Sequence, residues 1–350
     1  MNNGNERRRR GPSGVMALLM ILQIMLLTLT GCGRSPDRWP VPGPSGDTYE
    51  EEEWDSGMIE VDVGDGETRW IRRYDDVPVN PFNAGQFDFG DRFVRYLGED
   101  YTAVQGIDVS TFQGEIDWPA VAADGIGFAM IRIGGRGYSE GGLYEDDRFP
   151  ENLRGAVDSG IRAGVYFFSQ AVSPEEAEEE ADYVLSILAE LPEGSVTMPV
   201  AFDWEMVHEE GSRTVSMDGE TLTACAVAFC GKIAAAGYTP AVYAYRYLAY
   251  EMYDLSVLKG WPLWISTLDH SPDFYYYFDM WQYTENGVVD GIQGRVDLNL
   301  WFVPADAAAE TEEGPAEGPE TEKVTEAEPP EVPEEAVSPE GTDGEERMNP

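Results

Sequence analysis

Short apolar runs alternate with amphipathic segments between residues 106 and 303. Runs such as "FAMIRIG", "AGVYFFS" and "PVAFDW" have the length of strands that are buried on both faces. Each of the first five runs is followed by a segment with helical spacing, and this alternation predicts a parallel sheet. Three further runs, "PLWIS", "FDMWQYT" and "VDLNLWF", have little helix between them. Eight strands in about two hundred residues therefore predict an α/β fold, a compact β/α barrel of TIM-like type with parallel strands, whose last part has lost helices.

The start of one helix is marked especially clearly. Ser173 is a predicted N-cap, Pro174 takes the first helical position, and Glu176 completes a capping box. Asp117 in "EIDW" is likewise interpreted as a helix N-cap. Cys225 and Cys230, five residues apart on a predicted helix, diverge by roughly 140°. We therefore expect two buried thiols with no disulfide between them.

The first residues have the composition of an export signal. Arg7 to Arg10 form a basic segment, and the apolar run from Val15 to Thr30 is short for a transmembrane helix. The run ends in "LTGC", and small residues before a cysteine resemble a bacterial lipoprotein signal. We predict cleavage of residues 1–31 and lipid attachment to the membrane through Cys32. A plain secretion signal or a short anchor is the alternative, and every version exports the protein to the outer face of the membrane or beyond.

Composition divides the rest of the chain. Residues 32–60 are rich in Pro, Gly, Ser and acids, which predicts a flexible tether. Residues 61–103 form an extension with several aromatics, whose structure the sequence does not define. A barrel is predicted for residues 104–304. Residues 305–350 are dominated by Glu, Pro, Thr and Gly, which predicts a disordered acidic tail.

Charge and metal-binding residue types narrow the possible functions. The formal net charge of −43 argues against nucleic acid as a partner. The only histidines are His208 and His270, no zinc-type spacing occurs, and no nucleophile motif lies near them. We expect no metal, no cofactor and a monomer.

The stretch "PVAFDWE" carries two acids two residues apart. Side chains at Asp203 and Glu205 would share one face of a strand, and their proximity should raise at least one pKa. An isolated pair of this kind is more often a strand end that meets solvent. Here Asp108 follows the first predicted strand and Asp297 lies in the eighth. Barrels place their chemistry at the carboxyl ends of strands, so four acids should converge on one mouth.

Aromatic and amide side chains are predicted to join these acids. Acids in a cleft with aromatic walls are typical of proteins that bind and cleave sugars, because rings cover the apolar faces of pyranoses. Tyr275, Tyr276 and Tyr277 are interpreted either as further sugar-binding rings or as a lid, and Asp146 and Asp147 as a solvated loop. The candidate substrate-binding residues are Tyr166, Phe168, Tyr243, Trp264, Trp281, Gln282 and Tyr283.

The motifs "GIDVSTFQGEIDW", "FAMIRIG", "NLRGAVDSGIRAGVYFF", "PVAFDWE", "WQYT" and "VDLN" occur in the order found in family 25 glycoside hydrolases, the Chalaropsis-type lysozymes. The resemblance covers about residues 106–303. It implies an irregular, flattened barrel and N-acetylmuramidase activity on the glycan strands of peptidoglycan. It also implies a general acid at Glu205, a charge-stabilising partner at Asp203, and further cleft carboxylates at Asp108 and Asp297.

One position departs from the family pattern. The family usually has a small or aliphatic residue between the two acids, where this chain has Trp204. Alternation along the strand predicts that Trp204 points away from the lumen and packs behind the site. Asp108 has a second interpretation, in which it orders the loops by hydrogen bonds.

Two other functions stay open at this level. A catalytically inactive lipoprotein that binds peptidoglycan would keep the cleft and lose the reaction. An amidase or peptidase acting on wall peptides would need a zinc site or an activated cysteine, and neither pattern is visible in the sequence.

Overall fold

The computed structural model describes residues 57–64, 66–268 and 272–305. These residues all lie in one unit that begins at Asp55. The predicted signal peptide, the lipidation site Cys32, most of the tether, His270 and the acidic tail after Ala305 lie outside the described residues.

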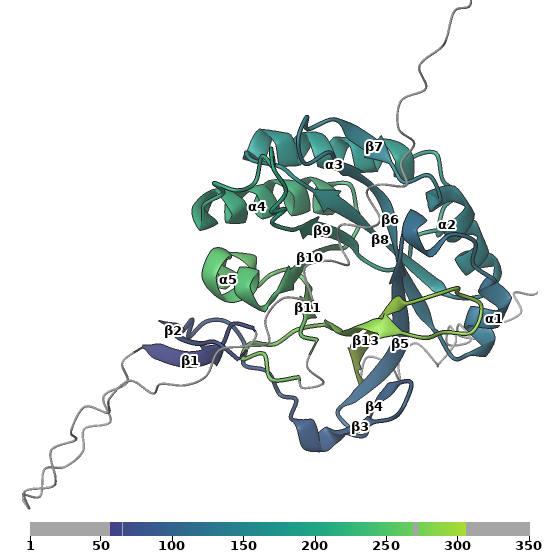
Figure 1. Cartoon of the computed structure of the whole chain (residues 1–350), viewed down its shortest axis with the longest axis horizontal. Helices are drawn as coiled ribbons and strands as arrows, with labels where there is room; N and C mark the ends of the chain where they lie inside the picture. The colour runs from purple at the N-terminus through teal and green to yellow at the C-terminus, as the bar shows by residue number, and fades with distance from the viewer. Residues whose placement is uncertain (1–56, 65, 269–271, 306–350) are drawn as a thin grey trace, which may run out of the picture. The chain divides into compact units, whose positions relative to one another are not determined.

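Eight strands close into a barrel (Figure 1). In spatial order the sheet runs β5, β13, β12, β11, β10, β9, β8 and β6, and pairing of β5 with β6 closes the ring. The short β7 (Leu143–Glu145) extends β6 as an antiparallel partner. The strand bounds are β5 Tyr101–Val109, β6 Phe128–Arg136, β8 Arg162–Ser169, β9 Val200–Trp204, β10 Pro240–Tyr245, β11 Leu263–Ser266, β12 Met280–Gly287 and β13 Val296–Pro304.

The expectation of an all-parallel barrel is wrong for one strand. β13 is antiparallel to both β12 and β5, while the other barrel strands run parallel to their neighbours. A chain that leaves β12 without a crossover helix can only return antiparallel. The absence of a helical segment between these two strands in the sequence is the physical reason.

Helices cover part of the outer wall. Ser173 accepts a hydrogen bond from Glu176 N and Asp117 accepts one from Ala120 N, so both predicted N-caps are confirmed. The helical segment expected after β10 is broken into a π-helical turn and a single short helix. The bounds are α1 Trp118–Ala123, α2 Phe149–Asp158, α3 Pro174–Leu188, α4 Gly219–Ala235, the π-helical turn Leu248–Met252, and α5 Leu255–Leu258.

Strand alternation sorts the side chains into two clusters. One fills the lumen and includes Phe128, Met130 and Trp264. The other lies between the sheet and its covering elements, where Phe229 of α4 contacts Phe202 of β9. Trp204 belongs to the outer cluster and is fully buried, as its alternation predicts. The two cysteines are also buried and free, as predicted.

The extension before the barrel is ordered and packs on it. It contains two hairpins and a 3-10 turn, and its first strand begins two residues before the predicted end of the tether. Phe82 contacts Phe302 of β13 with tilted rings, and Phe87 contacts Trp281 of β12 edge to face. The bounds are β1 Met58–Asp62, β2 Thr68–Arg72, the 3-10 turn Ala84–Gln86, β3 Phe87–Phe89 and β4 Val94–Tyr96. The extension therefore covers the strands that lack helices.

Main-chain contacts fix this extension to the segment before β12. Val79 forms an antiparallel bridge with Tyr276, and the side-chain amide of Asn80 donates to the carbonyl oxygens of Pro272 and Phe274 at 2.5 and 2.7 Å. Tyr276 is fully buried, and its hydroxyl accepts from Tyr74 N at 2.9 Å. Tyr276 is therefore a packing residue of this junction, and the interpretation of this tyrosine as a sugar-binding ring or lid is wrong.

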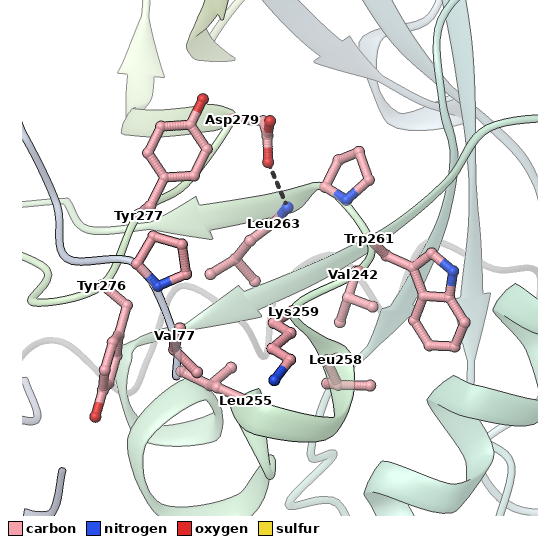
Figure 2. Close-up of a pocket in the computed structure, with 13 residues that line it drawn as sticks. Val77, Val242, Leu255, Leu258, Lys259, Trp261, Leu263, Tyr276, Tyr277 and Asp279 are labelled. Carbon is pink, nitrogen blue, oxygen red and sulfur yellow. Dashed lines mark hydrogen bonds between the residues drawn. The ribbon is translucent and has the colours of Figure 1, made fainter. Parts of the chain in front are cut away.

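A cavity of about 340 Å³ lies along the same junction (Figure 2). Val77 of the extension forms one wall, and Leu255 and Leu258 of α5 form another. Both charged residues that line it are already engaged: Asp279 accepts a hydrogen bond from Leu263 N at 3.0 Å, and Lys259 pairs with Asp76. None of the four candidate carboxylates lines this cavity.

Candidate active site

Four acids meet at one mouth of the barrel, as predicted. Asp108 is the eighth residue of β5, Asp203 the fourth of β9, and Glu205 follows β9 directly. Asp297 is the second residue of β13, and because that strand is antiparallel its amino end reaches the mouth where the other strands end. Asp297 is the direct register partner of Asp108.

Asp203 and Glu205 form a carboxyl pair. Asp203 is 5% exposed and Glu205 is half-buried. Burial raises the pKa of Asp203 well above its ordinary value, and the nearby charges of Glu205 and Asp108 raise it further. Burial is also the main cause that raises the pKa of Glu205, while its hydrogen bond with Asp203 opposes the shift. Such a pair titrates as a unit and retains a shared proton at a pH where a lone carboxyl is ionised.

One oxygen of this pair has no hydrogen-bond donor. Oδ1 of Asp203 is buried and accepts no hydrogen bond from any residue that the structure describes. A buried carboxylate oxygen without a donor is costly, so it favours either the protonated form or a donor from a bound molecule.

Gln282 links the two remaining acids. Its Nε2 donates to Oδ2 of Asp108 at 3.0 Å and lies 3.4 Å from Oδ2 of Asp297. Its Oε1 accepts from the Tyr243 hydroxyl at 3.1 Å. Asn299 donates a second hydrogen bond to Asp108 at 2.8 Å and accepts one from the indole of Trp264. Gln282 therefore positions carboxylates, which is a role the sequence prediction of substrate binding did not include.

Burial again dominates the titration of these two acids. It raises the pKa of Asp108, although the hydrogen bonds from Asn299 and Gln282 act in the opposite direction. Burial and the neighbouring Asp108 carboxylate together raise the pKa of Asp297 to about 9. Two close carboxyls that both resist ionisation share a proton at neutral pH.

The predicted aromatic residues divide between the two faces of the barrel wall. Tyr166, Tyr243 and Trp264 lie in the lumen, where Tyr243 and Trp264 have ring centroids 4.8 Å apart. Phe168 pairs in register with Asp203, and alternation along β8 gives it the same face as Tyr166.

Trp281 and Tyr283 were predicted to bind substrate, and the structure contradicts this. Both side chains belong to the outer cluster and are buried beneath the extension. Trp281 donates to Thr267 Oγ1 at 2.6 Å, and the Tyr283 hydroxyl accepts from Gln105 at 2.5 Å. On β12 the side chains of Met280 and Gln282 face the lumen, so those of Trp281 and Tyr283, which alternate with them, point outward.

An ion pair that the sequence pattern does not predict lies beside the acids. Arg132 of β6 is 9% exposed, its Nε and Nη2 both lie 2.7 Å from Oδ2 of Asp146, and its guanidinium covers the ring of Phe112 at 5.0 Å. Asp146 is 2% exposed, so its interpretation as a solvated loop residue is wrong. A single arginine inside the apolar run "FAMIRIG" was the available signal, because a buried cation requires a partner.

The described residues contain no group of three or more His, Cys, Asp or Glu side chains arranged to hold a metal ion. In the same part of the chain, no helix combines the length and the apolar character needed to cross a membrane.

Comparison with known families decides the assignment. The model of the glycosyl hydrolases family 25 matches residues 107–292, which include Asp108, Asp203 and Glu205. The chain belongs to glycosyl hydrolase family 25. It is therefore a glycoside hydrolase, and the resemblance seen in the sequence motifs is confirmed.

Two curated relatives agree with this family, and one solved structure shares the fold. Lysozyme M1 of Streptomyces globisporus is 29% identical over 208 residues, covering 57% of this chain and 68% of that protein. The autolytic lysozyme of Clostridium acetobutylicum is 26% identical over 197 residues, covering 56% of this chain and 55% of that protein. The modular autolysin LytC of Streptococcus pneumoniae, solved with a synthetic peptidoglycan ligand, shares the fold with a TM-score of 0.51 and 23% identity. That match covers 71% of this chain and 62% of LytC.

Proposed function

We propose that this protein is a lysozyme that hydrolyses the β-1,4 bond between N-acetylmuramic acid and N-acetylglucosamine in peptidoglycan. The observation that carries the proposal is the Asp203–Glu205 pair, whose pKa values are both raised, at the mouth of a family 25 barrel. The names of the Streptomyces and Clostridium relatives, both lysozymes, support the same activity.

Glu205 is the general acid in this proposal. It is the less buried member of the pair and lies beyond the end of β9, where a glycosidic oxygen can reach it. A carboxyl group that keeps its proton near neutral pH can protonate a leaving oxygen. The proton that it shares with Asp203 is the one transferred.

Asp203 stabilises the positive charge that develops in the sugar. The acetamido group next to the reacting carbon attacks that carbon, and Asp203 supports the acetamido nitrogen. Its buried Oδ1 matches this role, since that oxygen lacks the donor that an acetamido N–H would supply. Glu205 then acts as base towards water, so the configuration is retained.

Tyr166, Phe168 and Tyr243 supply the walls of the cleft. Ring faces of this kind cover the apolar faces of pyranoses. Asp108 and Asp297, linked by Gln282, provide a second carboxyl pair across the mouth from Asp203.

We place the enzyme outside the cytoplasmic membrane, attached through lipid on Cys32 or secreted, with the glycan strands of the wall as its partner. The sequence before Cys32 supports this location: a basic segment, then an apolar run, then the motif "LTGC".

Release of reducing ends from purified peptidoglycan tests the activity. A lysozyme releases reducing sugars in proportion to enzyme concentration. An inactive binding lipoprotein would sediment with the wall and release none, and an amidase or peptidase would release free amines. Mass spectrometry of the fragments then identifies which of the two glycosidic bonds is cleaved.

A further inference from the structure

Gln170 joins the end of β8 to the main chain of Glu205. The residue directly follows β8 and is fully buried. Its Nε2 donates to the carbonyl oxygen of Glu205 at 2.7 Å and to that of Ser169 at 2.8 Å. One of these hydrogen bonds crosses to the end of β9, and the other holds the side chain on the end of its own strand.

The hydrogen bond to Glu205 lies just beyond the last paired residues of β8 and β9. The register between β8 and β9 ends with the pair Ser169 and Trp204. Glu205 is one residue beyond that pair, so its main chain is outside the β8–β9 register. The Gln170 side chain therefore continues the connection between the strands by one residue, at the residue whose carboxyl group performs the chemistry.

The residues on either side of Gln170 are themselves fixed. The Ser169 hydroxyl donates to Oε2 of Glu180 at 2.5 Å and accepts from Ala171 N at 3.2 Å. Glu180 is fully buried and accepts from Nε of Arg136 at 2.7 Å. On the opposite side, the Trp204 indole donates to the carbonyl oxygen of Ala171 at 3.0 Å. Gln170 is held between a buried ion pair and the tryptophan that precedes Glu205.

We infer that Gln170 is a positioning residue for Glu205, because its amide fixes the main chain of the general acid against the end of β8. This inference rests on the proposed function, in which Glu205 protonates the glycosidic oxygen. Catalytic groups must be held to within about 0.5 Å of the productive geometry, and a misplacement of about 1 Å can cost about 100-fold in rate. The same link keeps the Glu205 carboxyl against Asp203 in its partly buried position.

The substitution Gln170→Met tests this role, since methionine has a similar length and donates no hydrogen bond. We expect kcat on peptidoglycan to fall about 10- to 100-fold with KM within about twofold of wild type. The shorter Gln170→Asn keeps the amide, so its kcat should lie between those of wild type and Gln170→Met. This second variant tests the role if the methionine variant folds poorly. Asn152→Leu is the matched control, because Asn152 is a buried amide on α2 without a role in the site.

A second measurement does not depend on turnover. Carbon-13 labelling of glutamate carboxyl groups allows Glu205 to be titrated by NMR, with its signal identified by its loss in Glu205→Gln. A loosened Glu205 is better solvated, so its pKa should be lower in Gln170→Met than in wild type and unchanged in Asn152→Leu. Because the pKa of Glu205 would be lower, the alkaline limb of the plot of kcat against pH should also move to lower pH in Gln170→Met.

The inference is wrong if Gln170→Met has the same Glu205 pKa as wild type and the same kcat as the control Asn152→Leu. It is equally wrong if only KM changes, which would indicate substrate binding. Failure of the proposed function has a different signature: wild-type protein would release no reducing ends, while the effect of Gln170→Met on the Glu205 titration would still be measurable.

Discussion

Asp108 and Asp297 face each other as register partners across β5 and β13, with the amide nitrogen of Gln282 3.0 and 3.4 Å from their carboxyl oxygens. Asn299 also donates to Asp108, but two neutral amides cannot compensate two buried negative charges. The pair therefore keeps a proton, and Asp297 has a pKa raised to about 9 by burial and by the charge of Asp108. Pairs of buried carboxyls with raised pKa values are concentrated at functional sites, which supports the proposed place of this pair in the cleft.

Replacing one of these acids should stabilise the protein in a pH-dependent way. The pKa of Asp297 is higher in the folded state than its ordinary value of 3.8, so folding takes up protons between about pH 4 and pH 9 and wild-type stability falls as pH rises through this window. Asp297→Asn removes this loss. We expect its advantage in Tm to be absent near pH 4 and to reach at least about 2–4 °C at pH 8, the shift that about 1 kcal/mol produces in a domain of this size, because the raised pKa of Asp297 is worth more than that at pH 8.

Thermal unfolding at several pH values measures this. The exposed Asp147 provides the control, because Asp147→Asn removes an acid from the surface and should leave the slope of Tm against pH unchanged. A parallel slope for wild type and Asp297→Asn would contradict the prediction.

The substitution Glu205→Gln removes the transferable proton and keeps the shape of the side chain. We expect kcat on peptidoglycan to fall by about 10² to 10⁴-fold, with folding intact, as is typical when a general acid is lost. Glu209→Gln, at an exposed position four residues further on, should retain full turnover. Near wild-type activity in Glu205→Gln would show that another group is the acid.

The sequence located the acids correctly because their positions depend on local order. A strand of alternating faces brings Asp203 and Glu205 together and sends Trp204 outward, whatever the rest of the chain does. Asp297 was placed at the correct mouth for an incorrect reason, since it comes from the amino end of an antiparallel strand. A parallel strand brings an acid to this mouth from its carboxyl end, and an antiparallel strand brings one from its amino end.

The aromatic residues of β12 show that the pattern of apolar and polar residues does not identify which face of a barrel strand is the inner one. In the run "MWQYT", Met280, Gln282 and Thr284 share one face, and Trp281 and Tyr283 share the other. Alternation alone cannot say which of these two faces is the lumen, because a barrel that carries a polar site can have its more polar face inside. The extension buries Trp281 from outside through Phe87, nearly two hundred residues away in sequence. Asp146 was misjudged for the same reason, because its partner Arg132 is brought to it only by the pairing of β6 with β7.

The extension should be part of the folding unit. Deleting residues 1–97 would expose Trp281 and Phe302, and large apolar side chains contribute about 1.5–3 kcal/mol each when buried. We expect a marked fall in Tm or insoluble protein. Deleting residues 306–350 is the control, because that composition cannot form a core, and Tm and turnover should stay nearly unchanged.

Differential scanning calorimetry of the two truncated proteins separates these expectations. An unchanged Tm after removal of the extension would mean that the barrel is stable without it. A large fall after removal of the acidic tail would mean that the tail docks on the barrel.

Cys32 should determine where the protein is found. If "LTGC" directs lipid attachment, wild-type protein partitions into the membrane fraction and incorporates labelled fatty acid, and Cys32→Ser loses both properties. Recovery of wild-type protein entirely from the medium, with a cleavage site elsewhere, would support the plain secretion signal instead.

The stereochemical course distinguishes the possible roles of Asp203. Alpha carbons two apart on a strand are roughly 6.5–7 Å from each other, and side-chain rotamers can bring the carboxyl groups to the spacing of either retaining or inverting enzymes. The buried Oδ1 of Asp203 has no hydrogen-bond donor, and this supports the prediction of retention through the substrate's own acetamido group, whose N–H it would accept in the intermediate. Proton NMR of fresh product should then show the β-anomer first. De-N-acetylated peptidoglycan should bind and be cleaved very slowly, since it lacks the internal nucleophile. Initial α-product would exclude retention, and rapid cleavage of the de-N-acetylated wall would assign the nucleophile to Asp203, Asp108 or Asp297.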